Sequence, residues 1–189
     1  MAITISGDSP NLTSAGLASP VFSGTPTGTG VLTSGTAVAS TSGTSIDFTS
    51  IPSWVKRITV MFSGVSTSGT SILLVRLGYG STTYETSGYS GGGAYTNNNS
   101  FTGNFANSVG FNLVGSASQA AALVSGTATF TNITGNTWLC SSVMGSPALL
   151  LAAYGGGNIA VSGALTAIRI TTVNGTDTFD AGSINILYE

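Results

Sequence analysis

Few side chains in this sequence could do chemistry, and the carboxylates come first among them. Histidine is absent and Cys140 is the single cysteine, so Ser-His pairs, Cys-His pairs and zinc sites built from these residues are excluded. A glycosidase would need two carboxylates about 5 to 10 Å apart across a cleft. The candidates are Asp177 and Asp180 in GTDTFDAG, with Glu85 as a third.

Asp177 and Asp180 lie three residues apart, which is typical of loops that hydrogen-bond their own backbone. A calcium loop would draw more oxygen ligands from the chain, and no EF-hand spacing is present. We therefore predict a structural role for both aspartates, with a calcium site and a catalytic pair as the alternatives. The protein is expected to be no enzyme and to hold no metal and no cofactor. Cys140, in the apolar run TWLCSSVM, is expected to be a small buried residue.

An aromatic and asparagine-rich segment, residues 86–108, is the candidate ligand-binding region. Its rings would offer flat apolar faces to a sugar or a protein, and its amides would donate and accept hydrogen bonds. We expect a long loop here, and long loops in compact sandwiches are often functional. The alternative is a connection whose aromatic rings lie in the core. The candidate residues are Tyr89, Tyr95, Asn97, Asn98, Asn99, Phe101 and Phe105.

The composition indicates a folded protein whose surface is largely uncharged. Charged residues make up 5% of the chain, and 27 glycines among 189 residues indicate frequent tight turns. Four basic residues are too few to neutralise several phosphates, so nucleic-acid binding is excluded. The first residues lack the pattern of a signal peptide, and no apolar run approaches the ~20 residues of a membrane span, so membrane insertion is not expected.

Short strands separated by turns are expected from about residue 34 onward. Alternation is cleanest in RITVMFS, residues 57–63, where Ile58, Val60 and Phe62 face one way. Residues 116–124 are the one candidate for a short helix. Turns are expected at 42–43, 68–69, 91–93, 134–136, 155–157 and 174–175. Further strands are expected at 36–39, 45–48, 72–77, 109–114, 128–133, 138–143, 149–153, 168–171 and 184–188.

This pattern predicts an all-β fold, an antiparallel β-sandwich with a jelly roll as the leading topology. Residues 1–33 differ, because they hold three of the five prolines and their apolar residues fit no helical period. We expect an extended N-terminal arm over 1–33 that anchors the chain on another subunit or protein, with a flexible tail as the alternative. The sandwich domain is expected over 34–189.

Two of the four basic residues, Lys56 and Arg57, are adjacent in IPSWVKRITVMF. Pro52 predicts a turn into the strand that begins near Val55, so both basic residues and Trp54 are expected at the rim of a sheet. Arg57 is expected to pair with a carboxylate, and Trp54 to cap one end of the core. An ordinary solvated rim is the alternative.

Two blocks of the sequence together resemble a module of tail fibre and related virion surface proteins of tailed bacteriophages. The first is SIDFTSIPSWVKRITVMFSGVSTSGT, residues 45–70, followed by LGYGSTTYETSGY at 77–89. The second is IRITTVNGTDTFDAGSINILYE, residues 168–189, which resembles the closing strands of that module. The opening AITISGDSPNLTSAGL also looks like the short starts by which such proteins attach to a virion.

The resemblance implies a structural virion protein, a homotrimer held to other virion proteins by its arm and made in the host cytoplasm. A tail fibre or fibre-tip adhesin that contacts a host surface glycan or receptor is the main functional hypothesis. A capsid decoration or cement protein, or a head fibre, is the alternative, because such proteins use jelly rolls of similar size. A polysaccharide depolymerase is a remote alternative that depends only on the available carboxylates.

Overall fold

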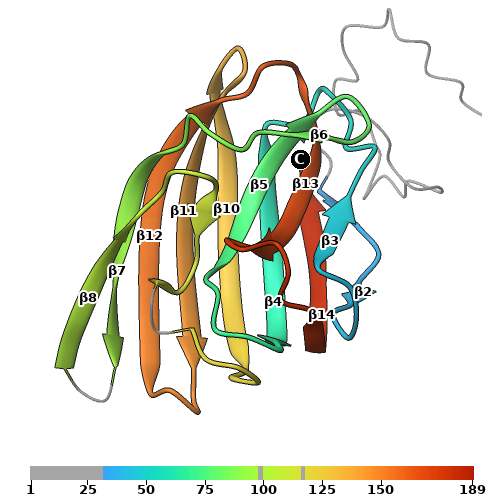
Figure 1. Cartoon of the computed structure of the whole chain (residues 1–189). Helices are drawn as coiled ribbons and strands as arrows, with labels where there is room; N and C mark the ends of the chain where they lie inside the picture. Colours follow the sequence, from blue (N-terminus) through green and yellow to red (C-terminus); the bar gives the residue numbers. More distant parts are fainter. Residues whose placement is uncertain (1–31, 98–99, 116–117) are drawn as a thin grey trace, which may run out of the picture. The chain divides into compact units, whose positions relative to one another are not determined.

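The computed structural model describes residues 32–97, 100–115 and 118–189, and Leu32–Glu189 form one compact unit. Two β-sheets pack face to face in this unit, and every pairing between described strands is antiparallel (Figure 1). The predicted all-β sandwich is confirmed. Nearly all of the predicted arm, residues 1–33, lies outside the described residues. The described part of the candidate short helix, residues 118–124, is not helical.

The larger sheet contains nine strands among the described residues. Its outer edges are β1, which pairs with one part of β14, and β8 at the opposite side. In spatial order the strands are β1 (Thr33–Ser34), β14 (Phe179–Tyr188), β4 (Arg57–Thr67), β10 (Val124–Thr134), β11 (Thr137–Ser146), β12 (Leu151–Ala160), β7 (Ser90–Asn97) and β8 (Ser100–Ala106), and β2 (Val38–Ala39) also pairs with β14.

The smaller sheet has five strands in the same described ranges. In spatial order they are β3 (Ser45–Phe48), β13 (Leu165–Thr172), β5 (Leu73–Tyr79) and β6 (Thr83–Tyr84), and β9 (Phe111–Asn112) also pairs with β5. This sheet lies in front of β4 and β14 in Figure 1, whereas β12, β7 and β8 extend to the left of it. The larger sheet is therefore only partly covered by the smaller one.

The order of the strands is that of a jelly roll with an enlarged sheet. An eight-stranded jelly roll pairs its first, eighth, third and sixth strands in one sheet, and its second, seventh, fourth and fifth in the other. Here β3, β13, β5 and β9 form the first sheet, and β4, β7 and β8 take the second, fourth and fifth places. The meander β10, β11, β12 replaces the single seventh strand, and β14 adds a strand beside β4.

The core lies between the two sheets and follows the alternation in the sequence. Ile58, Val60 and Phe62 of β4 are buried as predicted, while Thr59 and Met61 face the other way. At the edge of the smaller sheet, the segment that contains β9 extends the core. Its Phe111 is fully buried and lies 4.9 Å from the ring of Tyr89 and 5.6 Å from that of Phe130, measured between ring centroids.

Two of the predicted turns are wrong, because their glycines lie inside strands. Residues 91–93 belong to β7, residues 155–157 belong to β12, and the two triplets face each other in register. A Cβ atom at Gly93 would come closer than 3.0 Å to the Tyr154 carbonyl oxygen and to the Phe105 ring. Glycine allows these strands to approach each other closely. From the sequence alone, glycines with this role look the same as glycines that form a turn. The turn at Thr134-Gly135-Asn136 is confirmed as the β10–β11 connection.

The rim predicted around Lys56 and Arg57 is built against Glu189. Arg57 forms an ion pair with the Glu189 carboxylate, and the Glu189 carbonyl oxygen accepts hydrogen bonds from the amides of Lys56 (2.7 Å) and Arg57 (2.9 Å). Trp54 packs on Tyr188, with 6.2 Å between ring centroids. The predicted pairing of Arg57 with a carboxylate is confirmed, and these contacts fix β14 beside β4.

Removing Tyr188 and Glu189 should lower the free energy of unfolding by about 2 kcal/mol, because three backbone hydrogen bonds and the packing on Trp54 are lost together. Arg57→Gln should cost less than about 1 kcal/mol, since the ion pair is exposed to solvent. Urea unfolding of both variants measures the difference. An equal loss in the two variants would mean that the ion pair, and not the backbone, holds this rim.

Cys140 is buried on β11, as predicted, and burial raises the pKa of its thiol from 9.0 to about 12. The unfolded chain therefore releases this proton at lower pH than the folded chain does. It follows that folding stability is fully present below about pH 9 and falls as the pH rises towards about 12. We expect urea unfolding across this range to show the fall, and Cys140→Ala to make it shallower. An identical slope in the variant would show that other groups control the alkaline loss.

Candidate functional site

The segment predicted to be a long loop, residues 86–108, is mainly a β-hairpin. Strands β7 and β8 form it at the free edge of the larger sheet (Figure 1). Asn98 and Asn99 lie outside the described residues. Asn97 ends β7 and Phe101 lies on β8, at positions where the backbone alone is described. Tyr95, Asn97, Phe101 and Phe105 thus lie on two paired strands, and Tyr89 comes just before β7. The sequence indicated a loop because glycine and asparagine are depleted in strands.

Tyr89 belongs to the core and not to a surface. Its ring is 6% exposed and meets Phe111 edge to face. Its hydroxyl accepts a hydrogen bond from the Leu77 amide (2.9 Å) and donates one to the Glu85 carbonyl oxygen (3.2 Å). Burial raises the pKa of the phenol, since the charged form would lose its hydration. Tyr89 therefore links β5 to the start of the hairpin.

Tyr95 and Phe105 lie on the inner side of the hairpin, against glycines. A Cβ atom at Gly103 would be 2.8 Å from the Tyr95 hydroxyl, and one at Gly115 would be 2.8 Å from both rings. Tyr95 is buried and Phe105 is half-buried. An aromatic ring placed over glycine backbone in a neighbouring strand covers surface that no side chain protects. The structure therefore brings these two rings together as packing elements and separates them from Tyr89.

The described carboxylates all have polar partners. Asp177 accepts hydrogen bonds from the Ser71 amide (2.9 Å) and the Asn174 side chain (2.7 Å). Asp180 accepts one from the Ser66 hydroxyl, and Glu85 one from the Ser162 amide (2.7 Å). The predicted structural role of Asp177 and Asp180 fits these bonds. Among the described residues, no three His, Cys, Asp or Glu side chains gather as a metal site would require.

Charged side chains gather on the smaller sheet. Arg169 on β13 binds Asp47 on β3 through two hydrogen bonds, of 2.8 Å and 2.6 Å, and lies 4.2 Å above the Tyr84 ring. Burial and the nearby Asp47 carboxylate raise the pKa of Tyr84 to about 12. On the neighbouring strand, Arg76 donates to the Val109 carbonyl oxygen at 2.9 Å. These contacts join β13 to β3 and β6, and β5 to residue 109.

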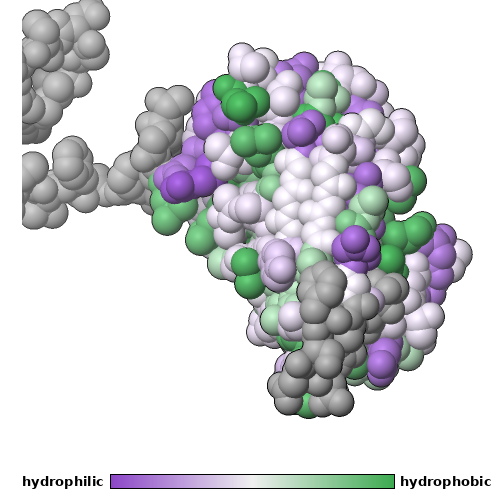
Figure 2. Space-filling model, turned by 90° about the vertical axis from the view of Figure 1, so that its left-hand side faces the viewer, coloured by the Kyte–Doolittle hydropathy of each residue, from purple (hydrophilic) through white to green (hydrophobic). Residues whose placement is uncertain are grey.

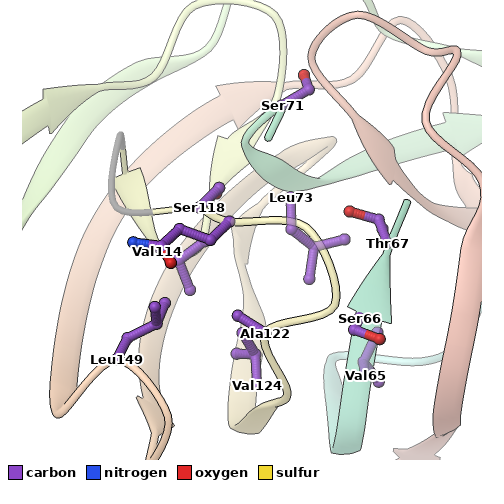
Figure 3. Close-up of a pocket in the computed structure, with 11 residues that line it drawn as sticks. Val65, Ser66, Thr67, Ser71, Leu73, Val114, Ser118, Ala122, Val124 and Leu149 are labelled. Atoms are coloured by element: carbon purple, nitrogen blue, oxygen red, sulfur yellow. The ribbon is translucent and has the colours of Figure 1, made fainter. Parts of the chain in front are cut away.

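A small pocket opens at one end of the sandwich, between the end of β4 and the start of β10 (Figure 3). Its centre has room for little more than a water molecule. Aliphatic side chains and a few hydroxyls line it, and none of its described lining residues is charged. The aliphatic residues are Val65, Leu73, Val114, Ala122, Val124 and Leu149. Its size and lining give no support to a reaction or to a charged ligand.

The feature that sequence reasoning missed is the outer side of β10, β11, β12, β7 and β8, which we name the uncharged face. These five strands are consecutive in the larger sheet, and their sequences contain no Asp, Glu, Lys or Arg. Its outward residues include Thr127, Thr129, Thr131, Leu139, Ser141, Val143, Ala152, Tyr154, Gly156, Asn158, Gly92, Ala94, Asn104 and Ala106.

The signal for this face was present in the sequence. Between Glu85 and Arg169 no charged residue occurs. The topology gathers that stretch into one half of the larger sheet, which composition alone does not reveal. Figure 2 views the side on which β7 and β8 lie and shows a broad pale area of intermediate hydropathy, as glycine, serine and threonine give. Exposed sheet faces of soluble proteins usually include charged residues. The absence of charge therefore makes this face a candidate for contact with another protein surface.

No protein-family model, no curated protein and no solved structure matches this chain. Among the described residues, no helix has the length and apolar character that crossing a membrane requires.

Proposed function

We propose that this chain is a non-enzymatic structural protein of a tailed bacteriophage virion. In this proposal the sandwich is exposed on the particle, residues 1–33 anchor it to other virion proteins, and three copies assemble. A tail fibre or fibre tip that contacts the host surface is the first candidate. A capsid decoration protein or head fibre is the second, and the uncharged face favours it as well, because a lattice of neighbours would cover such a face.

One observation supports the proposal most. The two blocks that resemble the fibre module, residues 45–70 with 77–89 and residues 168–189, are far apart in the sequence but supply strands of the same half of the sandwich. In the larger sheet β4 pairs with β14 over most of its length. In the smaller sheet β13 lies between β3 and β5. The resemblance therefore falls on neighbouring strands of one structural unit. The stretch between its blocks supplies β7, β8, β10, β11 and β12 of the larger sheet and β9 of the smaller one.

The Arg57 and Glu189 contacts strengthen this argument. The first block supplies Lys56 and Arg57, the second supplies Tyr188 and Glu189, and both the ion pair and the backbone bonds join one block to the other. A shared sequence pattern in two distant blocks is expected where the blocks must pack on each other. Asn97, Asn98, Asn99 and Phe101 stay the candidates for contact with a host glycan or receptor.

Quantitative mass spectrometry of gradient-purified particles tests the proposal. The phage whose genome encodes this chain should carry it at a constant ratio to the other structural proteins, in repeated preparations. A chain found in the lysate and absent from purified particles would refute a structural role in the virion.

A further inference from the structure

The uncharged face has both a projecting part and a recessed part. Val143 on β11 and Tyr154 on β12 are direct neighbours in register and are 64% and 54% exposed, so they rise from the sheet. The adjacent row across the strands is Ser141, Gly156 and Gly92, whose side chains are small or absent. A ridge of large apolar side chains therefore runs beside a strip of nearly bare backbone.

Charged side chains lie on the smaller sheet and at the rim, and Arg57 of the rim borders this face, because it pairs in register with Thr131 of β10. Arg76, Arg169 and Asp47 lie on the smaller sheet, and Lys56 and Arg57 lie at the rim of the larger one. A partner that covers the uncharged face but stops short of Arg57 would remove no ion from water, and desolvation of ions is the main cost of burying a polar surface. Charged residues on a partner would find no opposite charge to pair with on this face. The partner surface would have to be uncharged and complementary in shape to the projecting and recessed parts.

The size of the face is suitable for a stable contact. The middle of β4 and of β14, where Met61 and Leu187 face the same way, continues the uncharged face, so the contact surface would cover seven strands. At about 4.8 Å between strands and about 3.3 Å per residue, seven strands of seven residues span roughly 750 Å². A standard interface buries about 800 Å² on each partner.

We infer that the uncharged face is the surface through which copies of this chain associate with one another. A second copy offers all that the face requires: no charge, a flat sheet, an apolar ridge and a glycine strip in which the ridge of the other copy fits. Closed assemblies of identical chains bring such a patch to a symmetry axis. The inference names a partner for the proposed virion protein but does not depend on the virion assignment, because every step concerns the sandwich alone.

The test is the mass of the full-length chain in solution, by sedimentation velocity. The wild-type protein should sediment as two or three copies. Val143→Glu places like charges together at the axis and should weaken association roughly 100-fold or more. Val173→Glu is the control, because Val173 is also exposed, at 42%, and lies outside the uncharged face. This variant should keep the wild-type mass, and circular dichroism should show that both variants are folded.

Mixing two oppositely charged variants distinguishes loss of the contact between copies from misfolding of the variant. Val143→Glu and Val143→Lys should each be monomeric alone and should associate when mixed in equal amounts, since opposite charges then meet. A monomeric wild-type protein, a Val143→Glu variant that associates as the wild type does, or a mixture that stays monomeric would each overturn the inference. A monomeric wild-type protein would also contradict the assembly of three copies in the proposed function, whereas the presence of the chain in particles is measured separately.

Discussion

Phe130→Ala should lower the free energy of unfolding by about 4 kcal/mol, the largest loss that we expect from a single change in this protein. Phe130 is fully buried near the middle of β10, and its ring lies 5.6 Å from that of Phe111. Phe111 in turn meets Tyr89, so one aromatic group joins the larger sheet, β9 and the start of the β7–β8 hairpin. Truncation would leave a cavity that the surrounding strands cannot close without giving up their register.

Urea unfolding at one fixed protein concentration measures the effect, because self-association would add to stability at higher concentration. Ile133→Ala is the matched control, since Ile133 lies on the same strand and is 60% exposed. It should change the free energy of unfolding by less than about 0.5 kcal/mol. A loss below about 1 kcal/mol for Phe130→Ala would show that β9 does not pack under the sheet as described.

Gly93→Val should cost about 3 kcal/mol, because no side chain fits at this position. A Cβ atom there would press on the Tyr154 carbonyl oxygen and the Gly155 Cα atom, and also on the Phe105 ring. Two of these obstacles are backbone atoms of β12, which cannot move without breaking the β7–β12 ladder. The expected result is loss of the hairpin edge of the larger sheet together with the drop in stability.

Gly145→Val is the control for this change. Gly145 also lies in a strand, and the nearest atom to a Cβ built there is the Leu151 carbonyl oxygen at 3.8 Å. Neither glycine has a left-handed φ, so the comparison isolates the effect of space from that of backbone conformation. Gly145→Val should stay within about 0.5 kcal/mol of the wild type by urea unfolding. Equal losses in the two variants would mean that the facing glycine triplets are not closely packed.

The fold was predictable where period-two alternation is strong. Ile58, Val60 and Phe62 gave β4 its buried side, and the same pattern located β13 and β14. The glycines at 91–93 and 155–157 wrongly predicted turns, because the same residue allows a turn and permits two strands to approach closely. The wrong turn at 91–93 also made the hairpin of β7 and β8 look like a long loop.

The candidate site was less predictable than the fold. The aromatic residues of 86–108 were recognised, but whether a ring faces a glycine or the solvent depends on strands far away in the sequence. Tyr95 meets Gly115, and Phe105 meets Gly155, through pairings that no local pattern encodes. The uncharged face was hidden for the same reason. Its strands follow one another in the sheet in an order that differs from their order in the chain.

The role of Lys56 and Arg57 depended on a long-range contact in the same way. Their position at a rim follows from Pro52 and from the alternation that comes after it. Their partner, Glu189, lies at the other end of the sandwich sequence and meets them because β14 pairs with β4. The rim is therefore a joint between the two blocks that resemble the fibre module.

Labelling of intact particles tests the central claim most directly. An antibody raised against residues 32–189 would be applied to purified virions of the phage that we propose to encode the chain, and gold-labelled particles would be imaged. We predict label on the surface of the particle, where label at the tail identifies a fibre protein and label over the capsid identifies a decoration protein. Particles without label, in preparations whose soluble fraction reacts with the antibody, would contradict the account.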